Sequence, residues 1–331
     1  MGPVNTEITA PLHLWSRWYK SDRSGAYRNL YSPSSGRCRV VSSEGVRIGV
    51  LTDPYVEAYR AEALRAALTE MNAEISYVVV DSRELDDESA SRERSRSSLS
   101  GRLARKCRSL WEHGGWSLIN FERRLMRRLF GNPRFHSHHE RKPVEKLSVF
   151  DRAELEYCQP TEMDENWVTF PSEVVSSFEE KTDVIVRFGF GLVTGDILTA
   201  TEYGVLSFHP ADIRTYRGLG PTLMFVNGDD EITVTLQRLT DTIDGGEVVL
   251  FSSTTADVHT YDDLMSEIAD LKIDMLPEGL ERVQQNALES YGPTELGDYY
   301  PVSTREQFGF ATKFILKDLF RNIYRYVIKR N

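Results

Sequence analysis

The sequence predicts an α/β fold built on a Rossmann-like, mostly parallel sheet that is flanked by helices. Residues 46–53 and 75–81 are short apolar runs of strand length, and residues 56–72 between them carry apolar side chains at helical spacing. A strand, a helix and a strand within about 35 residues form one βαβ unit, in which the two strands are expected to be parallel. Apolar runs of strand length recur at residues 183–188, 204–209, 232–236 and 248–251.

The composition limits the protein class before any motif is considered. The chain has 331 residues, long enough for one large α/β domain with appendages. Its formal net charge of −10 argues against nucleic acid as a bulk partner, and its 3 cysteines are too widely spaced for a disulfide framework or a zinc site. No apolar run approaches the ~18 residues of a membrane span. We therefore expect a soluble, cytoplasmic protein.

Breaks in the alternation of strands and helices suggest the domain boundaries. Residues 1–44 interleave aromatic and basic side chains and are expected to form a partly disordered arm. The α/β domain is expected over 45–290, with an insertion at about 82–182 that begins with a Ser/Arg-rich run. Residues 291–331 are expected to contain a Gly/Pro linker and a C-terminal basic amphipathic helix.

The insertion contains a basic amphipathic stretch at 99–130, which Gly114 and Gly115 are expected to break into a helical hairpin. Its basic side chains outnumber Glu112 and Glu122, in contrast with the acidic chain as a whole. They are Arg102, Arg105, Lys106, Arg108, Arg123, Arg124, Arg127 and Arg128. One interpretation is recruitment of an anionic membrane surface or lipid-linked glycan, with the protein peripheral at the inner face of the membrane. The alternative for this stretch is a helix face that is simply solvated. The C-terminal helix is a separate case, and it could pack on the body of the protein or on a second copy in a homodimer.

Two other patterns exclude common sites. No Gly-x-Gly-x-x-Gly follows the first strand, so a dinucleotide site of that type is not supported. His136, His138 and His139 have no helical ligand spacing and no adjacent carboxylate or cysteine to complete a set, so no metal is expected.

The most informative stretch is 204–250, where a strand-length run ends at His209-Pro210 and an Asp244-Gly245-Gly246 turn follows the next run. A histidine and an aspartate at neighbouring strand ends can face one crevice, the usual position of a site in an open α/β sheet. Histidine is the side chain that can exchange a proton near neutral pH, and a carboxylate can hold its ring in one tautomer.

This stretch resembles the folate-dependent formyltransferases, the family of glycinamide ribonucleotide, methionyl-tRNA and sugar N-formyltransferases. Their pattern is Asn-x-His-Pro-Ser-Leu-Leu-Pro-x-Tyr-Arg-Gly, followed roughly three dozen residues later by Asp-x-Gly. The chain matches it at His209-Pro210, Tyr216-Arg217-Gly218 and Asp244-Gly245-Gly246, and it departs from it at Ser207 and at residues 211–214. The Ser-Phe-His form is most like an uncharacterised, glycan-associated branch. The resemblance covers about 46–81 and 183–275 and implies the formyltransferase fold.

The resemblance also implies roles for individual residues. His209 would be the base, Asp244 its carboxylate partner, and Ser207 would stand where the family asparagine donates to the oxyanion. 10-Formyltetrahydrofolate would be the formyl donor, held by Phe190, Gly191, Leu192 and Asp241. The amine substrate would meet Arg214, Tyr216, Arg217 and Gly218. A serine offers one O–H where an asparagine offers two N–H donors, and loss of one oxyanion donor lowers rates by about 10²–10³-fold.

Together these observations predict formyl transfer from 10-formyltetrahydrofolate to an amine of an amino sugar or sugar nucleotide. Charged Asp212 and Arg214, in place of apolar residues, favour an anionic acceptor that meets Arg214 or Arg217. The alternative is a catalytically altered homologue that binds a glycan or nucleotide. A tRNA substrate stays open because the family includes it.

Overall fold

The computed structural model describes residues 45–83, 99–163, 167–255, 258–292 and 294–328, with the side chains of 99–113 and 302 excepted. The predicted arm at 1–44 lies outside the described residues.

The first elements are β1 (Val46–Thr52), β2 (Tyr55–Glu57), α1 (Ala58–Glu70), β3 (Ala73–Asp81), α3 (Leu99–Phe130), α4 (Pro133–His139), β4 (Arg141–Pro143), η1 (Val144–Lys146), η2 (Ser148–Phe150) and β5 (Glu154–Cys158). Next come β6 (Thr161–Glu162), β7 (Trp167–Thr169), α5 (Ser172–Lys181), β8 (Val184–Arg187), β9 (Leu192–Val193), η4 (Asp196–Thr199) and β10 (Val205–His209). The last are β11 (Tyr216–Gly218), α6 (Pro221–Asn227), β12 (Ile232–Arg238), β13 (Glu247–Thr254), α7 (Tyr261–Gln284), β14 (Asp298–Tyr300), η5 (Val302–Glu306) and α8 (Phe308–Ile328).

The central sheet has seven strands in the order β13-β12-β10-β8-β1-β3-β5. The five strands from β10 to β5 are mutually parallel, and β12 runs antiparallel to both β10 and β13. The predicted α/β class with a mostly parallel sheet is therefore confirmed. The βαβ unit expected at 46–81 is β1, α1 and β3, whose register pairs Val50 with Val78.

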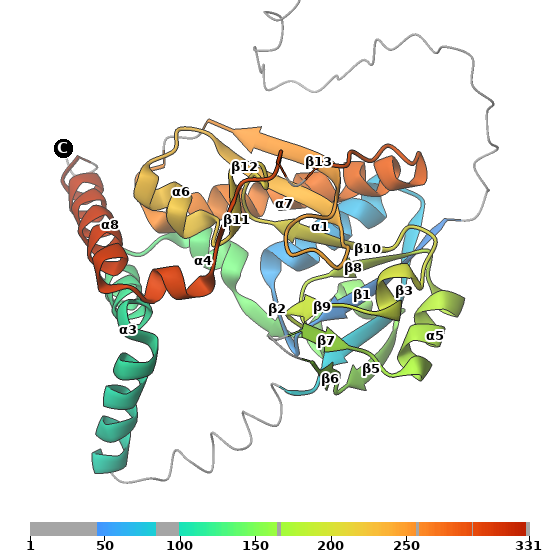
Figure 1. Ribbon diagram of the computed structural model, residues 1–331, viewed down its shortest axis with the longest axis horizontal. Helices are drawn as coiled ribbons and strands as arrows, with labels where there is room; N and C mark the ends of the chain where they lie inside the picture. The colour runs from blue at the N-terminus through green and yellow to red at the C-terminus, as the bar shows by residue number, and fades with distance from the viewer. Residues whose placement is uncertain (1–44, 84–98, 164–166, 256–257, 293, 329–331) are drawn as a thin grey trace, which may run out of the picture. The chain divides into compact units, whose positions relative to one another are not determined.

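Helices cover both faces of this sheet (Figure 1). Leu64 of α1 and Leu276 of α7 are buried with Val50 and Val186 in the core of one face. On the other face, Phe178 of α5 packs with the side chains of the alternate strand positions, including Leu51 and Ile185. A Cβ at Gly49 would lie 2.6 Å from the Phe178 ring, so this glycine allows α5 to approach the centre of the sheet.

The stretch expected as an insertion, 82–182, contributes more to the domain than the sequence indicated. Its residues 154–158 form β5, the edge strand that pairs in parallel with β3. Its residues 172–181 form α5, which covers a face of the sheet. The interruption between consecutive strands of the sheet is therefore limited to the segment between Asp81 and Glu154.

The stretch expected as a linker and a C-terminal helix, 291–331, contains strand β14 and helix α8, and both pack on the domain. Strand β14 pairs in parallel with β11, so that Gly218 lies opposite Tyr300. The following helix α8 packs on the second half of α3, where the helical path of α3 is broken at Gly114 (φ 40°, ψ −122°). A Cβ at Gly115 would lie 2.6 Å from the Cβ of Ala311, which explains why a small residue stands where the two helices meet. No helix among the described residues is both long enough and apolar enough to cross a membrane.

Candidate active site

The structure brings His209 and Asp244 together at one edge of the central sheet. His209 is the last residue of β10, and Asp244 lies in the connection between β12 and β13. The Nδ1 atom of His209 lies 3.2 Å from Oδ1 of Asp244. Asp244 has a positive φ of 45°, a backbone conformation that costs energy for a residue other than glycine. The turn therefore holds the carboxylate against the ring at the expense of local strain.

The second ring nitrogen of His209 is also occupied. Its Nε2 atom lies 2.8 Å from the carbonyl oxygen of Tyr216, and the side chain is only 3% exposed. A carbonyl accepts hydrogen bonds, and an ionised carboxylate only accepts them. A ring that carries a proton on both nitrogens satisfies both partners. His209 can take a proton from a substrate only after Nε2 has left the Tyr216 carbonyl and has lost the proton that it donates there.

Asp244 is held in its ionised form by its surroundings. Burial alone would raise its pKa, but the hydrogen bond and charge of His209, the Gly218 backbone N–H and the nearby Arg187 guanidinium together lower the pKa below its ordinary value. The Gly218 N–H donates to Oδ2 at 2.7 Å. The carboxylate therefore contacts both the histidine and the Tyr-Arg-Gly strand.

The Tyr-Arg-Gly strand, β11, contacts both His209 and the turn that carries Asp244. The Arg217 guanidinium donates to the Ile243 carbonyl, with Nη2 at 2.6 Å, and so fixes the residue before Asp244. Gly218 has a φ of 77°, and a Cβ there would lie 2.3 Å from the Tyr300 carbonyl oxygen of β14. The Tyr216 hydroxyl accepts a hydrogen bond from Asn227 at 2.9 Å.

Ser207 contacts Arg187, a residue that the sequence analysis placed only in a strand. The two are register partners on the parallel strands β8 and β10. Nη2 and Nε of Arg187 donate to Oγ of Ser207 at 2.8 and 3.2 Å, and its Nη1 donates to the Gly191 carbonyl. Burial lowers the pKa of Arg187 to about 10, against the opposing attraction of Asp244. The guanidinium still carries its charge at neutral pH.

Arg187, Ser207 and His209 share one face of the sheet. Side chains alternate between faces along a strand, so Ser207 and His209, two residues apart on β10, point the same way. Strand pairing places Arg187 beside Ser207. Only this pairing of β8 with β10 identifies Arg187, because the sequence alone does not show which residue lies opposite Ser207.

The first residue of the loop predicted to hold folate, Phe190, is buried in the core. Phe190 is 1% exposed and packs against the Phe170 ring at 5.0 Å, so its side chain belongs to the core and does not line an open wall. Its φ of 69° turns the chain sharply into exposed Gly191 and half-buried Leu192. Exposed Asp241 accepts a hydrogen bond from the Thr194 hydroxyl at 2.8 Å, so Asp241 lies beside the segment that follows this loop.

Two further charged residues that the sequence analysis did not single out stabilise this loop. Arg60 donates to the Phe188 carbonyl at 2.6 Å and lies 3.6 Å from Asp53, which directly follows β1. Burial raises the pKa of Asp53, although Arg60 opposes this effect. Gly189 fits tightly over Asp53, because a Cβ on this glycine would lie 2.4 Å from the carboxylate. The strand ends of β1 and β8 thus form one polar cluster.

Arg214 is placed differently from the expectation that it meets an anionic substrate. Its Nη2 atom lies 2.7 Å from Oδ2 of Asp212, and its guanidinium stacks 4.0 Å from the centre of the Phe251 ring. The carboxylate two residues away compensates its charge, so this result counts against Arg214 as a substrate ligand. Arg217 makes no ion pair among the described residues.

His138 and His139, two of the three histidines between 136 and 139, contact acids that are distant in the sequence. His139 lies 2.9 Å from Glu57, and His138 lies 3.2 Å from Asp270. Within the described part of the chain, no group of three or more histidines, cysteines, aspartates or glutamates is arranged to hold a metal ion.

Comparison with known proteins assigns this edge of the sheet to a family. Residues 139–280, which include His209 and Asp244, match the family model described as formyl transferase. Residues 139–280 belong to the formyl transferase family. The resemblance of the strand-end motif to the folate-dependent formyltransferases is thereby confirmed, and the formyl transferase match also includes β5 and α5 from the stretch expected as an insertion.

Curated relatives agree with this assignment. Methionyl-tRNA formyltransferase of Thermotoga maritima is 25% identical over 150 residues, 44% of this chain and 46% of the relative. The enzyme of the same name from Rickettsia prowazekii is 29% identical over 102 residues, 30% of this chain and 33% of the relative. The chain thus spans less than half the length of either relative. A glycinamide ribonucleotide transformylase from Symbiobacterium toebii superposes with a TM-score of 0.44 at 16% identity, covering 78% of this chain and 100% of that structure. An N-formyltransferase from Helicobacter canadensis superposes with a TM-score of 0.46 at 9% identity, covering 81% and 79%.

Proposed function

We propose that the protein is an enzyme that transfers a formyl group from 10-formyltetrahydrofolate to an amine. The observation that carries this proposal is the His209–Asp244 pair, 3.2 Å apart at the end of β10, with the Arg187–Ser207 pair on the same face beside it. One pair can handle a proton and the other can donate hydrogen bonds to a developing negative charge. Acyl transfer to nitrogen requires both functions.

His209 would act on the proton of the acceptor amine. The amine nitrogen would form a bond to the formyl carbon while the bond between that carbon and the folate nitrogen breaks. His209 would accept the amine proton at Nε2 once this atom has left the Tyr216 carbonyl and has lost the proton that it donates there, and it would pass a proton on to the departing folate nitrogen. Asp244 would keep Nδ1 in place and stabilise the charged ring. The acceptor amine and the formyl group must therefore enter where the Tyr216 carbonyl now contacts the ring.

Arg187 and Ser207 fit the role that the family asparagine would have. The guanidinium is charged, half-buried and fixed by three hydrogen bonds to Ser207 and Gly191. A cationic donor held in place in a poorly solvated site stabilises negative charge more strongly than a neutral amide does. When bound, 10-formyltetrahydrofolate would supply the formyl group, and exposed Gly191, Leu192 and Asp241 would be the residues nearest to it in this cluster.

The acceptor that we propose is an amino sugar or a sugar nucleotide. Arg217 is the cation available for a phosphate, because among the described residues it contacts only the Ile243 carbonyl and the Tyr299 ring. Tyr299 is half exposed beside it, and an aromatic face is suited to stack on a nucleobase or a sugar ring. Methionyl-tRNA is the competing acceptor, since the curated relatives are named for it.

Titration calorimetry with 5-formyltetrahydrofolate, a stable analogue of the donor, tests the proposal most directly. We expect saturable binding to the full chain, and transfer of a labelled formyl group to an amino-sugar nucleotide that is lost in His209→Ala. Absence of folate binding would refute the proposal, and transfer to methionyl-tRNA alone would correct the acceptor.

A second candidate function is favoured by the hydrogen bonding and burial of His209. Because both ring nitrogens are engaged and the ring is buried, a homologue that binds a glycan or nucleotide without transferring a formyl group would need no change in structure. Binding of the nucleotide sugar without folate binding would identify this second function.

A further inference from the structure

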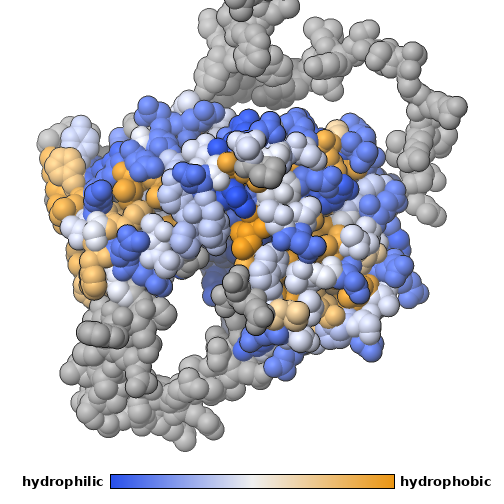
Figure 2. All heavy atoms as spheres, in the orientation of Figure 1, coloured by the Kyte–Doolittle hydropathy of each residue, from blue (hydrophilic) through white to orange (hydrophobic). Residues whose placement is uncertain are grey.

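The helix pair formed by α3 and α8 carries apolar side chains on its outer surface. We use the name α3–α8 face for the exposed apolar residues Phe121, Leu125, Leu129, Leu316, Phe320, Ile323, Tyr324 and Val327. Phe121 is 69% exposed and Phe320 is 71% exposed. Figure 2 shows hydrophobic side chains gathered along α8 at the edge of the molecule.

Packing within the domain does not explain these residues. The inner side of each helix already supplies a full set of core contacts, through Ile119 and Met126 of α3 and through Ala311 and Phe314 of α8. On α8 the exposed residues at 316, 320, 323 and 327 follow the spacing of one helix face, opposite the buried residues at 311, 314 and 318. A helix that is apolar on two opposite faces has a second surface to bury, and clustered exposed apolar residues mark an interaction site.

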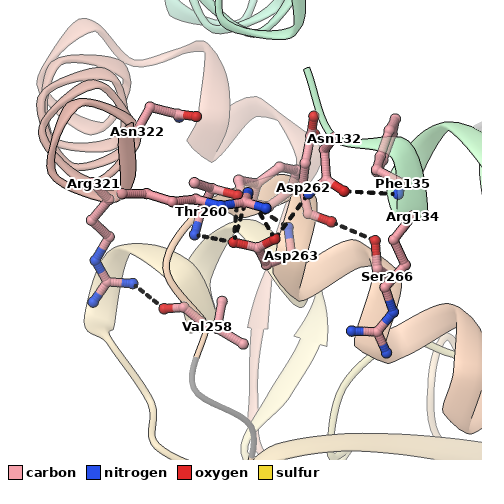
Figure 3. A network of polar contacts seen from close by, with 12 residues as sticks. Asn132, Arg134, Phe135, Val258, Thr260, Asp262, Asp263, Ser266, Arg321 and Asn322 are labelled. Carbon is pink, nitrogen blue, oxygen red and sulfur yellow. Dashed lines mark hydrogen bonds and ion pairs between the residues drawn. The ribbon is translucent and has the colours of Figure 1, made fainter. Parts of the chain in front are cut away.

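Polar contacts with α7 and with the segment before it hold the helix pair in a fixed orientation. Arg127 of α3 forms a bidentate pair with Asp262 at the start of α7, at 2.7 and 2.8 Å. From α8, Arg325 lies 3.1 Å from Asp263, and Arg321 donates to the Val258 carbonyl at 3.1 Å (Figure 3). These arginines occupy the side of each helix that faces the body, which leaves the α3–α8 face outward.

The charged residues exposed around the α3–α8 face are all basic. Between Gly114 and Phe130 and between Phe308 and Val327, the exposed charged side chains are Arg124, Arg128 and Lys313. The acids of these two segments, Glu122 and Asp318, are buried. On a chain with a formal net charge of −10, the outer surface of this helix pair is therefore a local region of positive charge without exposed carboxylates.

We propose that the α3–α8 face docks the protein on an anionic lipid surface. Aromatic and aliphatic side chains bordered by basic residues are the combination by which helices bind at the boundary of lipid headgroups without crossing the bilayer. Arginine and lysine beside the apolar residues meet the negative charge of the headgroups. The proposal rests on this face alone and does not depend on formyl transfer.

The charge pattern disfavours a second copy of the chain as the occupant. In a two-fold symmetric dimer the same patch meets itself, so Arg124, Arg128 and Lys313 would face basic residues of the copy. Between residues 114 and 130 and between 308 and 327, no exposed acid is present to pair with them. An anionic membrane offers both the apolar depth and the counter-charge, so it satisfies both features at once.

Vesicle co-sedimentation of the full chain tests this docking. We expect binding to phosphatidylcholine vesicles that contain phosphatidylserine, weaker binding to phosphatidylcholine alone, and further weakening at high salt. Replacing Arg124, Arg128 and Lys313 together by glutamine should lower partitioning about 100-fold, at about 1 kcal/mol for each basic residue. Phe320→Ser with Ile323→Ser should lower binding to both kinds of vesicle.

Matched variants on other surfaces serve as controls. Arg152→Gln with Lys146→Gln removes exposed basic residues elsewhere, and Met163→Ser removes an exposed apolar side chain; neither should alter binding. Circular dichroism of every variant verifies that it folds. Equal binding of wild type and the glutamine variant, or absence of vesicle binding, would overturn the proposal. A dimer in sedimentation velocity that Phe320→Ser dissociates would also overturn it, in favour of a contact between copies.

Discussion

The sheet edge at His209 and the helix pair of α3 and α8 differ in which kind of side chain is buried and which is exposed. At the sheet edge, polar side chains are buried and nearly every one contacts a polar partner: His209 with Asp244 and Tyr216, and Arg187 with Ser207. In the helix pair, apolar side chains such as Phe320 are exposed.

The difference separates a region that is complete from one that requires a partner. Burying a charge is tolerated only when hydrogen bonds and opposite charges compensate for the lost water, and the sheet edge meets this condition internally. None of the residues that the structure describes covers the exposed apolar area on these two adjacent helices. We therefore expect substitutions at the sheet edge to affect chemistry and those on the outer helix face to affect location.

The largest expected effect is that of Asp244→Asn at the sheet edge. The amide would leave Nδ1 of His209 without its carboxylate, so the ring would lose both its fixed tautomer and the stabilisation of its charged form. We expect kcat to fall by about 10²–10⁴-fold, the range for loss of general acid–base catalysis. Formyl transfer under saturating substrates measures this effect. Asp230→Asn, on an exposed loop, is the matched control; equal activity of wild type and Asp244→Asn would mean that this pair is structural.

A smaller loss is expected for Arg187→Met. The substitution keeps an unbranched stem like the aliphatic part of arginine but removes the donors that now reach Ser207 and Gly191. We expect kcat to fall by about 10²–10³-fold with little change in KM, the result for a donor that acts in the transition state. Ser207→Asn restores an amide donor and should recover part of the rate in the Arg187→Met background. A change confined to KM would assign Arg187 to substrate binding instead.

The comparison also shows which features a sequence reveals. The strands at the sheet edge were predictable because each is a continuous apolar run, and the histidine and aspartate because they stand where such runs end. Arg187 was missed because its role depends on the pairing between β8 and β10. This pairing brings it next to Ser207, 20 residues later in the chain, and no local sequence pattern encodes that contact.

Short strands escaped prediction for a related reason. β5 reads Glu154-Leu155-Glu156-Tyr157-Cys158 and is the outermost strand of the central sheet on the side of β3. A polar face is tolerated on an outermost strand, so β5 lacks a continuous apolar run. β14 has three residues between glycine and proline and is stabilised by pairing with β11. In both cases tertiary pairing determines the structure, and local propensity is weak.

A third test affects the link between β11 and β14. Gly218→Ala places a Cβ 2.3 Å from the Tyr300 carbonyl at a φ of 77°, so the two strands must separate. We expect a loss of stability of about 1–3 kcal/mol, typical of strained backbone positions, together with reduced activity because the Gly218 N–H bonds to Asp244. Thermal unfolding measures the first effect. Gly309→Ala in α8 is the control, since a Cβ there meets nothing within 4 Å; equal stability of both variants would show that β14 moves freely.

The smallest expected effect lies in the helix pair, where Glu122 of α3 is buried beside Asp318 of α8. Burial raises the pKa of Glu122 to about 8, with contributions from Asp318 and Asp262 that Arg123 opposes in part. In the unfolded chain this group ionises near its ordinary value of 4.5. Between these two values the unfolded state loses the proton while the folded state keeps it, so stability falls as the pH rises through this window.

Glu122→Gln removes this ionisation and retains the shape of the side chain. We therefore expect the variant and the wild type to have similar unfolding temperatures at pH 5, and the variant to be more stable by a few degrees at pH 8. Thermal unfolding at several pH values between these limits measures the difference. Glu62→Gln, at an exposed position of α1, should give a difference that does not change with pH in this way. If Glu122→Gln destabilises the protein equally at pH 5 and pH 8, the Glu122 carboxyl is already ionised in the folded state, and the helix pair accommodates its charge as the sheet edge accommodates that of Asp244.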